Sequence, residues 1–328
     1  MTRAVFAAAA ALVGYTYVAF PALVLLRARL RPRPHRSAPV TPSVSIVIAA
    51  RNEAASIAAK IENLRALVAP FADPEVGGVA GDQRYLADGG TDAIAAGERK
   101  YWDLDRMLKA AESRAGNVIS ATGAIYAVRR SLFRSLPDGV TDDFFTSTGV
   151  VAQGYRLVFA PDAIAFEPVA STGEIEFGRK VRVMTRGLRG VLLRRALLDP
   201  RRHKFYAVQL LTHKLLRRTM VVPLAVAAIT SPLLWRRRRI YRVATVAQAS
   251  LYGLGGVGIV FSRRPLGRRK AFMLPAFICF VNAAATRAIW NLVLGRRIDR
   301  WETQRPDAGR TDREGGRAEA AAPRSSVG

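Results

Sequence analysis

The feature that most constrains this chain is a long, uncharged apolar run at residues 4–26, with a dense cluster of arginines at residues 27–36 directly after it. The run is long enough to cross a hydrocarbon layer of about 30 Å. A secretory signal peptide carries its positive charges before the apolar stretch, whereas here most of the charge follows it. This order favours an uncleaved membrane anchor over a cleaved signal peptide. The positive-inside rule then places the next domain in the cytoplasm.

Three more apolar runs lie towards the C-terminus, at residues 220–235, 243–261 and 271–294. The first is short for a membrane span. The last contains Arg287, and an ionisable residue at membrane depth usually faces other helices or a polar cavity. Arginine clusters lie on both sides of the first run and again after the second. We therefore expect a multi-pass protein of the cell membrane, with the number and topology of the C-terminal spans left open.

Composition excludes several classes of protein. Lys and Arg number 51 against 25 Asp and Glu, a formal net charge of +26, while 50% of the residues are hydrophobic. That hydrophobic content excludes a disordered chain, and the separation of apolar runs from arginine clusters argues against an ordinary soluble enzyme. The single cysteine, Cys279, excludes a disulfide framework and a cysteine-based zinc site. With three histidines in the chain, a histidine-rich metal site is not expected.

The pattern divides the chain into four parts. An N-terminal anchor with a basic linker (1–39) precedes a cytoplasmic domain (40–200). A basic interfacial segment with C-terminal membrane helices (201–295) comes next, and a polar tail (296–328) is expected to be disordered.

The cytoplasmic domain begins with a strand-to-helix signal. Residues 44–49 form a β-branched apolar run, which predicts a buried parallel strand. Asn52 is placed to cap the helix that follows. The apolar residues of that helix fall on one face: Ile57, Ile61, Leu64 and Val68. A strand that runs into a helix N-terminus forms a cradle for phosphate, although every α/β fold offers one.

Five segments, in order, make the signal specific. They are SVSIVIAARNEAASIAAKIENL (43–64), FADPEVGGVAG (71–81), SATGAIYAVRRSLF (120–133), TDDFFTSTGVVAQGYRLVFAPDAIAFE (141–167) and RKVRVMTRGLRG (179–190). Together they resemble the family 2 glycosyltransferases, and the last aligns with the Q-x-x-R-W region of the processive, cellulose-synthase-like members. The resemblance implies an α/β fold of the Rossmann-like GT-A class, here truncated, together with transmembrane helices.

The resemblance implies a general base at Asp143, in the Thr141-Asp142-Asp143 segment. Glycosyl transfer needs a group that accepts the proton of the acceptor hydroxyl and positive charge on the leaving diphosphate. Asp142, the neighbouring carboxylate, is expected to raise the pKa of Asp143. The alternative is an Asp pair that caps a helix.

The donor side is expected from two segments. The first strand and its Arg-Asn-Glu loop imply nucleotide contacts from Ala49, Arg51 and Glu53. Arg179 and Arg182, with Lys180 between them, resemble the cationic group that meets the diphosphate, because the planar fork of arginine suits phosphate oxygens. The alternative for these cations is a basic juxtamembrane helix on anionic lipid.

The acceptor side is expected at Thr122, Gly123 and Ala124, where small residues allow a close approach to the backbone. The alternative here is tight packing. Val183 stands where the family has the tryptophan that supports the acceptor sugar, which argues against a tight polymer channel.

Two acidic motifs of the family are absent between the first helix and residue 73. One contacts the nucleotide base, and the other, Asp-x-Asp, holds the Mg²⁺ or Mn²⁺ expected for the family, so no metal ligand is assigned here. The stretch 88–92 resembles the first motif but lies after the next strand. Asp103 and Asp105 sit in a helical stretch, where residues two apart point about 200° away from each other.

Three hypotheses follow. The first is a membrane-anchored glycosyltransferase that takes a nucleotide-sugar donor and passes the sugar to a lipid or glycan acceptor, with no nucleic acid as a partner. The second is a catalytically defective relative that lacks the donor and metal site. The third, from another class, is a basic membrane protein that binds anionic lipid.

Overall fold

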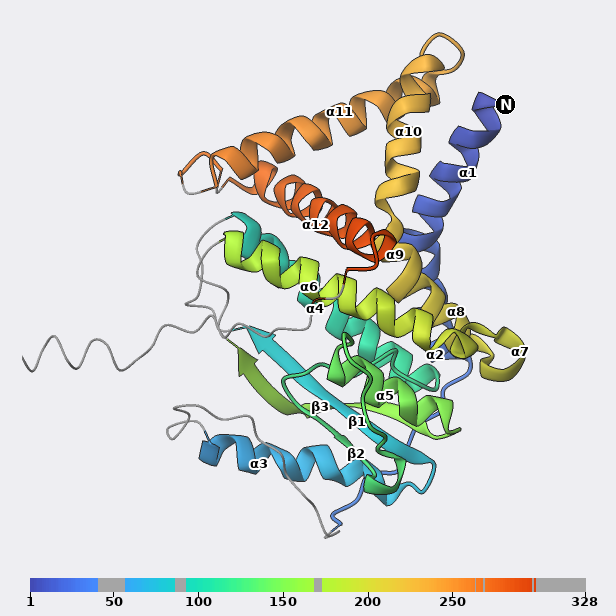
Figure 1. Ribbon diagram of the computed structural model, residues 1–328, viewed down its shortest axis with the longest axis vertical. Helices are drawn as coiled ribbons and strands as arrows, with labels where there is room; N and C mark the ends of the chain where they lie inside the picture. Colours follow the sequence, from blue (N-terminus) through green and yellow to red (C-terminus); the bar gives the residue numbers. More distant parts are fainter. Residues whose placement is uncertain are drawn as a thin grey trace, which may run out of the picture.

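The core of the protein is a small mixed sheet (Figure 1). The computed structural model describes residues 1–40, 57–85, 93–167, 173–262, 264–267, 269–296 and 298. In these ranges the strands run in the order β2-β1-β3. Strand β1 (Val76–Tyr85) pairs in parallel with β3 (Arg156–Glu167) and antiparallel with the short β2 (Tyr126–Val128). Valines at buried positions of β1 and β3 give the continuous apolar pattern that a sheet covered on both faces requires.

Helices cover both faces of this sheet. Helix α3 (Ile57–Val68) continues into the 3-10 turn η2 (Ala69–Ala72) and packs Leu67 against Val76 and Val79 of β1. On the opposite face lie α4 (Ala93–Ala115), α5 (Asp142–Ala152) and α6 (Gly173–Leu193), as Figure 1 shows. The cluster on that face joins Phe144 of α5, Leu157 and Phe159 of β3 and Val191 of α6. The predicted α/β layering is present, and the predicted helix at 57–68 is confirmed.

Short elements connect these layers to the apolar helices. The 3-10 turns η3 (Arg130–Leu132) and η4 (Arg195–Leu198) precede α5 and α7, respectively. A chain of short helices then leads upward: α7 (Pro200–His203), α8 (Phe205–Leu210), the π-helical η5 (Leu211–Leu216) and α9 (Arg217–Thr219).

The apolar runs form helices on the far side of α4 and α6 from the sheet (Figure 1). The helix Thr2–Leu30 comprises α1 (Thr2–Gly14), the π-helical η1 (Tyr15–Ala19) and α2 (Phe20–Leu30). It is long and apolar enough to cross a membrane, as are α11 (Arg239–Val260) and α12 (Lys270–Val293), whereas α10 (Val221–Leu233) is shorter. The four predicted apolar runs therefore correspond to helices.

These helices also contact the soluble domain. Phe20 and Val24 of α2 pack against Leu108 of α4, and Phe280 of α12 meets Phe177 of α6 with ring centroids 5.5 Å apart. Arg287 is exposed on α12 and does not face the bundle; it lies within the last two turns, where a long side chain can reach the interface. The two π-helical turns touch through Tyr15 and Thr212, whose hydroxyl oxygens are 3.2 Å apart.

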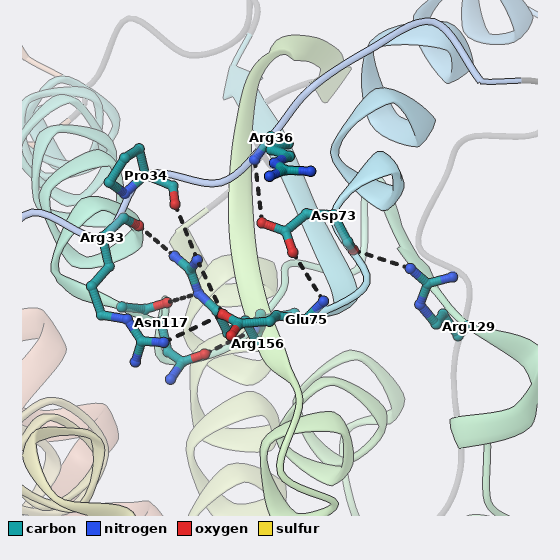
Figure 2. A network of polar contacts seen from close by, with 10 residues as sticks. Arg33, Pro34, Arg36, Asp73, Glu75, Asn117, Arg129 and Arg156 are labelled. Atoms are coloured by element: carbon teal, nitrogen blue, oxygen red, sulfur yellow. Dashed lines mark hydrogen bonds and ion pairs between the residues drawn. The ribbon is translucent and has the colours of Figure 1, made fainter.

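A buried arginine connects the segment that follows helix Thr2–Leu30 to the sheet (Figure 2). Arg156, at the start of β3, donates hydrogen bonds to the backbone oxygens of Arg33 (2.6 Å), Pro34 (3.3 Å) and Gly116 (3.1 Å). The carboxylate of Glu75 lies 3.9 Å from the same guanidinium. The rigid fork of arginine thus joins three separate segments at one point.

Candidate active site

The predicted base and the predicted acceptor segment lie together. Asp142 and Asp143 occupy the first turn of α5, after the N-cap residue Thr141. A Cβ placed on Gly123 would stand 3.9 Å from Oδ2 of Asp143. Carboxylates in a first turn are favoured by the helix dipole, so the capping interpretation of this pair also agrees with its position.

Hydrogen bonds from three helices hold the acceptor segment in place. Ser147 Oγ of α5 accepts from the backbone N–H of Ala121 (3.0 Å), and the Tyr206 hydroxyl of α8 donates to the carbonyl of Ile119 (2.8 Å). Glu112 of α4 accepts from the N–H of Ile119 (3.4 Å). Thr122 Oγ1 is buried without a hydrogen-bond partner among the described residues. A buried hydroxyl with free hydrogen-bonding capacity, one residue before Gly123, is suited to a polar ligand.

Burial raises the pKa of Asp143 above its usual value, and the neighbouring carboxylate of Asp142 acts in the same direction. The N–H of Phe144 and the positive charges of Lys214 and Arg218 oppose the shift without cancelling it. Desolvation is the dominant cause, because a charged carboxylate loses hydration that two nearby cations only partly replace. A carboxylate with a raised pKa is a stronger proton acceptor when ionised.

Lys214 is the cation that the structure places beside this carboxylate. It comes from η5, and its ammonium lies 5.5 Å from the ring centroid of Phe144, the residue after Asp143. Burial, and to a smaller extent the charge of the nearby Arg218, lowers the pKa of Lys214 to about 8, although Asp105 and Asp143 act in the opposite direction. Lys214 thus keeps its charge at neutral pH and faces carboxylates on two elements.

A second buried carboxyl lies behind this pair. Glu112 of α4 lies 3.7 Å from Nε2 of His213. Burial raises the pKa of Glu112 to about 8, and burial lowers the pKa of His213 to about 3. At pH 7 both groups are therefore neutral, and the contact is not an ion pair. The neutral pair leaves Lys214 and Arg218 as the cations that compensate the charge of Asp143.

The predicted diphosphate cations lie elsewhere on α6. Glu176 holds Arg179 at 2.8 Å and Lys180 at 2.9 Å. The contact between α6 and α5 forms at Gly190, eight residues beyond Arg182 and about 12 Å along the helix axis. The structure therefore does not bring Arg179 and Arg182 to Asp143 through the contact between α5 and α6. Ala49, Arg51 and Glu53 lie outside the described residues.

The described carboxylates do not fit a divalent cation. In the ranges that the structure covers, no group of three or more His, Cys, Asp or Glu side chains is placed to hold a metal. Asp82, buried near the end of β1, lies 2.8 Å from Arg84 and 3.8 Å from Arg106. Asp105 lies in α4, as the sequence predicts, and pairs with Lys109 at 3.3 Å. Both carboxylates are already compensated by cations.

Sequence reasoning missed Lys214, Glu112 and His213. The available signal was a titratable pair set among leucines in QLLTHKLL (209–216), a composition that is unusual for a simple surface helix. Their role depends on which side of the helix meets α4 and α5. That packing is tertiary, so the local pattern does not predict it.

Comparison with known proteins identifies a family and a relative. Residues 61–285 match the family described as Glycosyl transferase family group 2, which covers more than half of the chain. An N-acetylglucosaminyltransferase from Rhizobium meliloti (strain 1021) is 30% identical over 118 residues, which is 32% of this chain and 28% of that relative. The match thus spans less than a third of the relative's length.

A solved structure is also similar. It is a mannosyltransferase from Pyrobaculum calidifontis in complex with GDP-Man and Mn²⁺, with a TM-score of 0.47 and 22% sequence identity. The similarity covers 70% of this chain and 58% of that one.

Proposed function

Because the chain belongs to the glycosyl transferase family group 2, we propose that it transfers a hexosyl group from a nucleotide-sugar to a hydroxyl of a lipid or glycan acceptor. The observation that carries this proposal is the buried carboxylate of Asp143, set against Gly123 and beside Lys214. The acceptor approaches over Thr122, Gly123 and Ala124.

The chemistry assigns one proton transfer to the chain. The acceptor oxygen forms the new bond to the sugar carbon, the bond from that carbon to the diphosphate breaks, and the nucleoside diphosphate leaves with the electron pair. Asp143 receives the proton of the acceptor hydroxyl. Its raised pKa supports this role, and Asp142 contributes to the shift. Lys214 keeps Asp143 ionised before the proton arrives.

The donor half of the proposal depends on the family resemblance. Ala49, Arg51 and Glu53 are assigned to the nucleotide, and Arg179 and Arg182 to the diphosphate. Arg179 must exchange its carboxylate partner Glu176 for phosphate oxygens to take this role. A divalent cation is expected for the family, and no step is assigned to it here because the described carboxylates do not fit one.

The reaction takes place at the cytoplasmic face of the cell membrane. Three helices are long and apolar enough to span it, and the arginines that follow the first span support a cytoplasmic position for the sheet. The acceptor site lies beneath these helices, which suits a lipid or a membrane-held glycan.

The test is release of nucleoside diphosphate from UDP- and GDP-sugars by the purified full-length chain in lipid nanodiscs, with membrane lipid extract as acceptor. Wild-type protein is expected to turn over. Asp143→Asn is expected to lower turnover about a thousandfold while donor binding, measured by calorimetry with UDP and Mn²⁺, stays unchanged. Turnover by Asp143→Asn equal to wild type would overturn the assignment of the base.

One observation favours a second candidate, a relative that binds an acceptor without transferring sugar. The buried carboxylate of Asp82 and the half-buried carboxylate of Asp105 are held by arginine and lysine, so they are not available to a cation. This candidate predicts that neither UDP with Mn²⁺ nor any nucleotide-sugar binds the wild-type chain in the same calorimetric titration.

A further inference from the structure

A basic pocket lies away from the proposed transfer site. It has a volume of about 600 Å³ and opens where α2, α7 and α8 meet the starting ends of β1 and β3. Val151 and Gly154, at the C-terminal end of α5, line it, whereas Asp143 lies in the first turn of that helix, about 12 Å away along the axis. The pocket therefore does not share the carboxylate assigned to sugar transfer.

The lining of this pocket is strongly cationic. Glu75 is the one acidic residue among those that line it. Five lining residues are cationic: Arg27, Arg33, Arg156, Arg202 and Lys204. Arg156 is committed to three backbone oxygens, and Arg33 pairs with Glu75 at 3.3 Å (Figure 2). Arg202 lies 3.7 Å from Asp199. Two cations, Arg27 and Lys204, remain to be explained.

The guanidinium of Arg27 is held in one orientation, but one of its buried nitrogen atoms has no hydrogen-bond partner among the described residues. Its guanidinium stacks on the ring of Phe205, 4.5 Å from the centroid. Its Nε is buried and has no hydrogen-bond partner in the described part of the chain. Stacking fixes the plane of a guanidinium while its N–H edge stays available for an anion. An unpaired buried donor on a cation is costly unless a ligand satisfies it.

Lys204 adopts a backbone conformation that side chains rarely take. Its φ is 50° and its ψ is −127°, and it is the one non-glycine residue with positive φ among the described residues. Glycine would occupy this position without strain. Strained residues of this kind cluster at ligand sites, and here the strained residue is a lysine between α7 and α8 that lines the pocket.

The position of Arg27 in the chain, directly after an apolar run, suits a lipid headgroup. Arg27 lies in the last turn of the helix Thr2–Leu30, which is long enough to span a membrane. Phosphate groups lie at this level of a bilayer and attract basic residues there. The geometry points to a phosphate-binding site formed by Arg27 and Lys204, which takes either the headgroup of an anionic lipid or a soluble phosphate ester.

Native mass spectrometry of the full-length chain in detergent tests this inference. The probes are phosphatidylglycerol, phosphatidylcholine and inorganic phosphate. Wild-type protein is expected to retain one phosphatidylglycerol in preference to phosphatidylcholine. Lys204→Gly and Arg27→Gln are each expected to weaken that retention about tenfold, since each removes one charged contact to the phosphate.

Arg201→Gln is the matched control, because Arg201 is an exposed neighbour on α7 that does not line the pocket. It removes the same charge and is expected to keep the retention. Lys204→Gly relieves the backbone strain, so its melting temperature is expected to equal or exceed that of wild type, which separates binding from folding.

The competition arm identifies the source of the phosphate. Displacement of phosphatidylglycerol by excess inorganic phosphate assigns the site to the phosphate group from either source, whereas retention against inorganic phosphate assigns it to the lipid. Equal loss of lipid in Arg201→Gln and Lys204→Gly would overturn the pocket as the site. Equal retention of phosphatidylcholine and phosphatidylglycerol by wild type would also overturn it.

Discussion

Arg156 and Lys214 are two buried cations of one domain, and their surroundings are opposite in kind. Arg156 donates to three backbone oxygens at the start of β3, in the network that Figure 2 shows. Lys214 lies against the ring of Phe144 and is attracted to the carboxylates of Asp105 and Asp143. The hydrogen bonds of Arg156 go to fixed backbone oxygens, with Glu75 3.9 Å away, whereas Lys214 is compensated by groups that titrate.

This difference indicates a structural role for one cation and a role near the reaction for the other. A buried charge with a full set of hydrogen bonds contributes to the fold and has no remaining capacity for a ligand. A buried charge that depends on titratable neighbours changes with their protonation, which is the usual condition of a reactive site. We therefore expect changes at Arg156 to affect stability first, and changes around Lys214 to affect the reaction or its pH dependence first.

Asp143→Asn is expected to have the largest effect, a loss of transfer of about a thousandfold, or about 4 kcal/mol of barrier. The amide keeps the volume of the side chain but cannot accept the proton. Initial rates of nucleotide release measure it. The matched control is Asp142→Asn, an exposed neighbour, for which we expect a loss below about tenfold. Equal losses for the two variants would contradict the separation of their roles.

Arg156→Met is expected to lower the free energy of unfolding by about 2 to 3 kcal/mol, because three backbone oxygens lose a charged donor. Thermal unfolding in detergent measures this change. Arg156→Lys keeps the charge without the fork and is expected to recover less than half of the loss. A normal melting temperature for Arg156→Met would show that the linker is held by other contacts.

Glu112→Gln is expected to change the pH dependence of stability. Burial raises the pKa of Glu112 from 4.5 to about 8, so the folded protein keeps a proton that the unfolded chain releases. The free energy of unfolding therefore falls as the pH rises between these values, by up to about 2 kcal/mol between about pH 6 and about pH 8.

Lys214 affects the free energy of unfolding in the opposite direction, and at higher pH than Glu112. Its pKa falls from 10.5 to about 8, so the unfolded chain binds the extra proton and stability rises with pH between these values. Wild-type protein is thus expected to be least stable near about pH 8. Melting temperatures of wild type and Glu112→Gln across this range check both signs. An unchanged decline below about pH 8 in Glu112→Gln would contradict the assignment to Glu112.

Gly123→Ala is expected to have the smallest effect on folding, within about 0.5 kcal/mol. The added methyl would stand 3.9 Å from Asp143 Oδ2, an ordinary van der Waals contact. The same methyl occupies the approach of the acceptor, so the transfer rate should fall about tenfold while the melting temperature stays unchanged. A normal rate would place the acceptor elsewhere.

The family and the α/β transferase fold could be predicted from the order of short segments, and the family match and the layered sheet confirm them. The positions of the helices could also be predicted, because the spacing of apolar residues indicates helix Ile57–Val68 and the length of the apolar runs indicates the long apolar helices. The roles assigned to Asp142, Asp143, Thr122, Gly123 and Ala124 stay predictions, although the structure brings the two segments together.

The remainder of the site depends on packing between distant elements. The family resemblance predicts Arg179 as a phosphate ligand. In the structure, Arg179 forms an ion pair with Glu176, which lies one helical turn earlier. In the sequence, Lys214 belongs to a stretch rich in leucine. In the structure, the packing of η5 against α4 and α5 brings Lys214 beside Asp143. Neither outcome follows from residue spacing, because each depends on which side of a helix is covered.

The contact between Tyr15 and Thr212 joins the two π-helical turns, one in the apolar helix Thr2–Leu30 and one that contains Lys214. A helix that spans a bilayer changes its tilt with bilayer thickness. With the helix Thr2–Leu30 in the proposed membrane position, we expect a change of its tilt to displace the segment that carries Lys214. The rate of sugar transfer should therefore vary with the acyl-chain length of the surrounding lipid, and Tyr15→Phe, which removes the hydroxyl, should weaken that dependence.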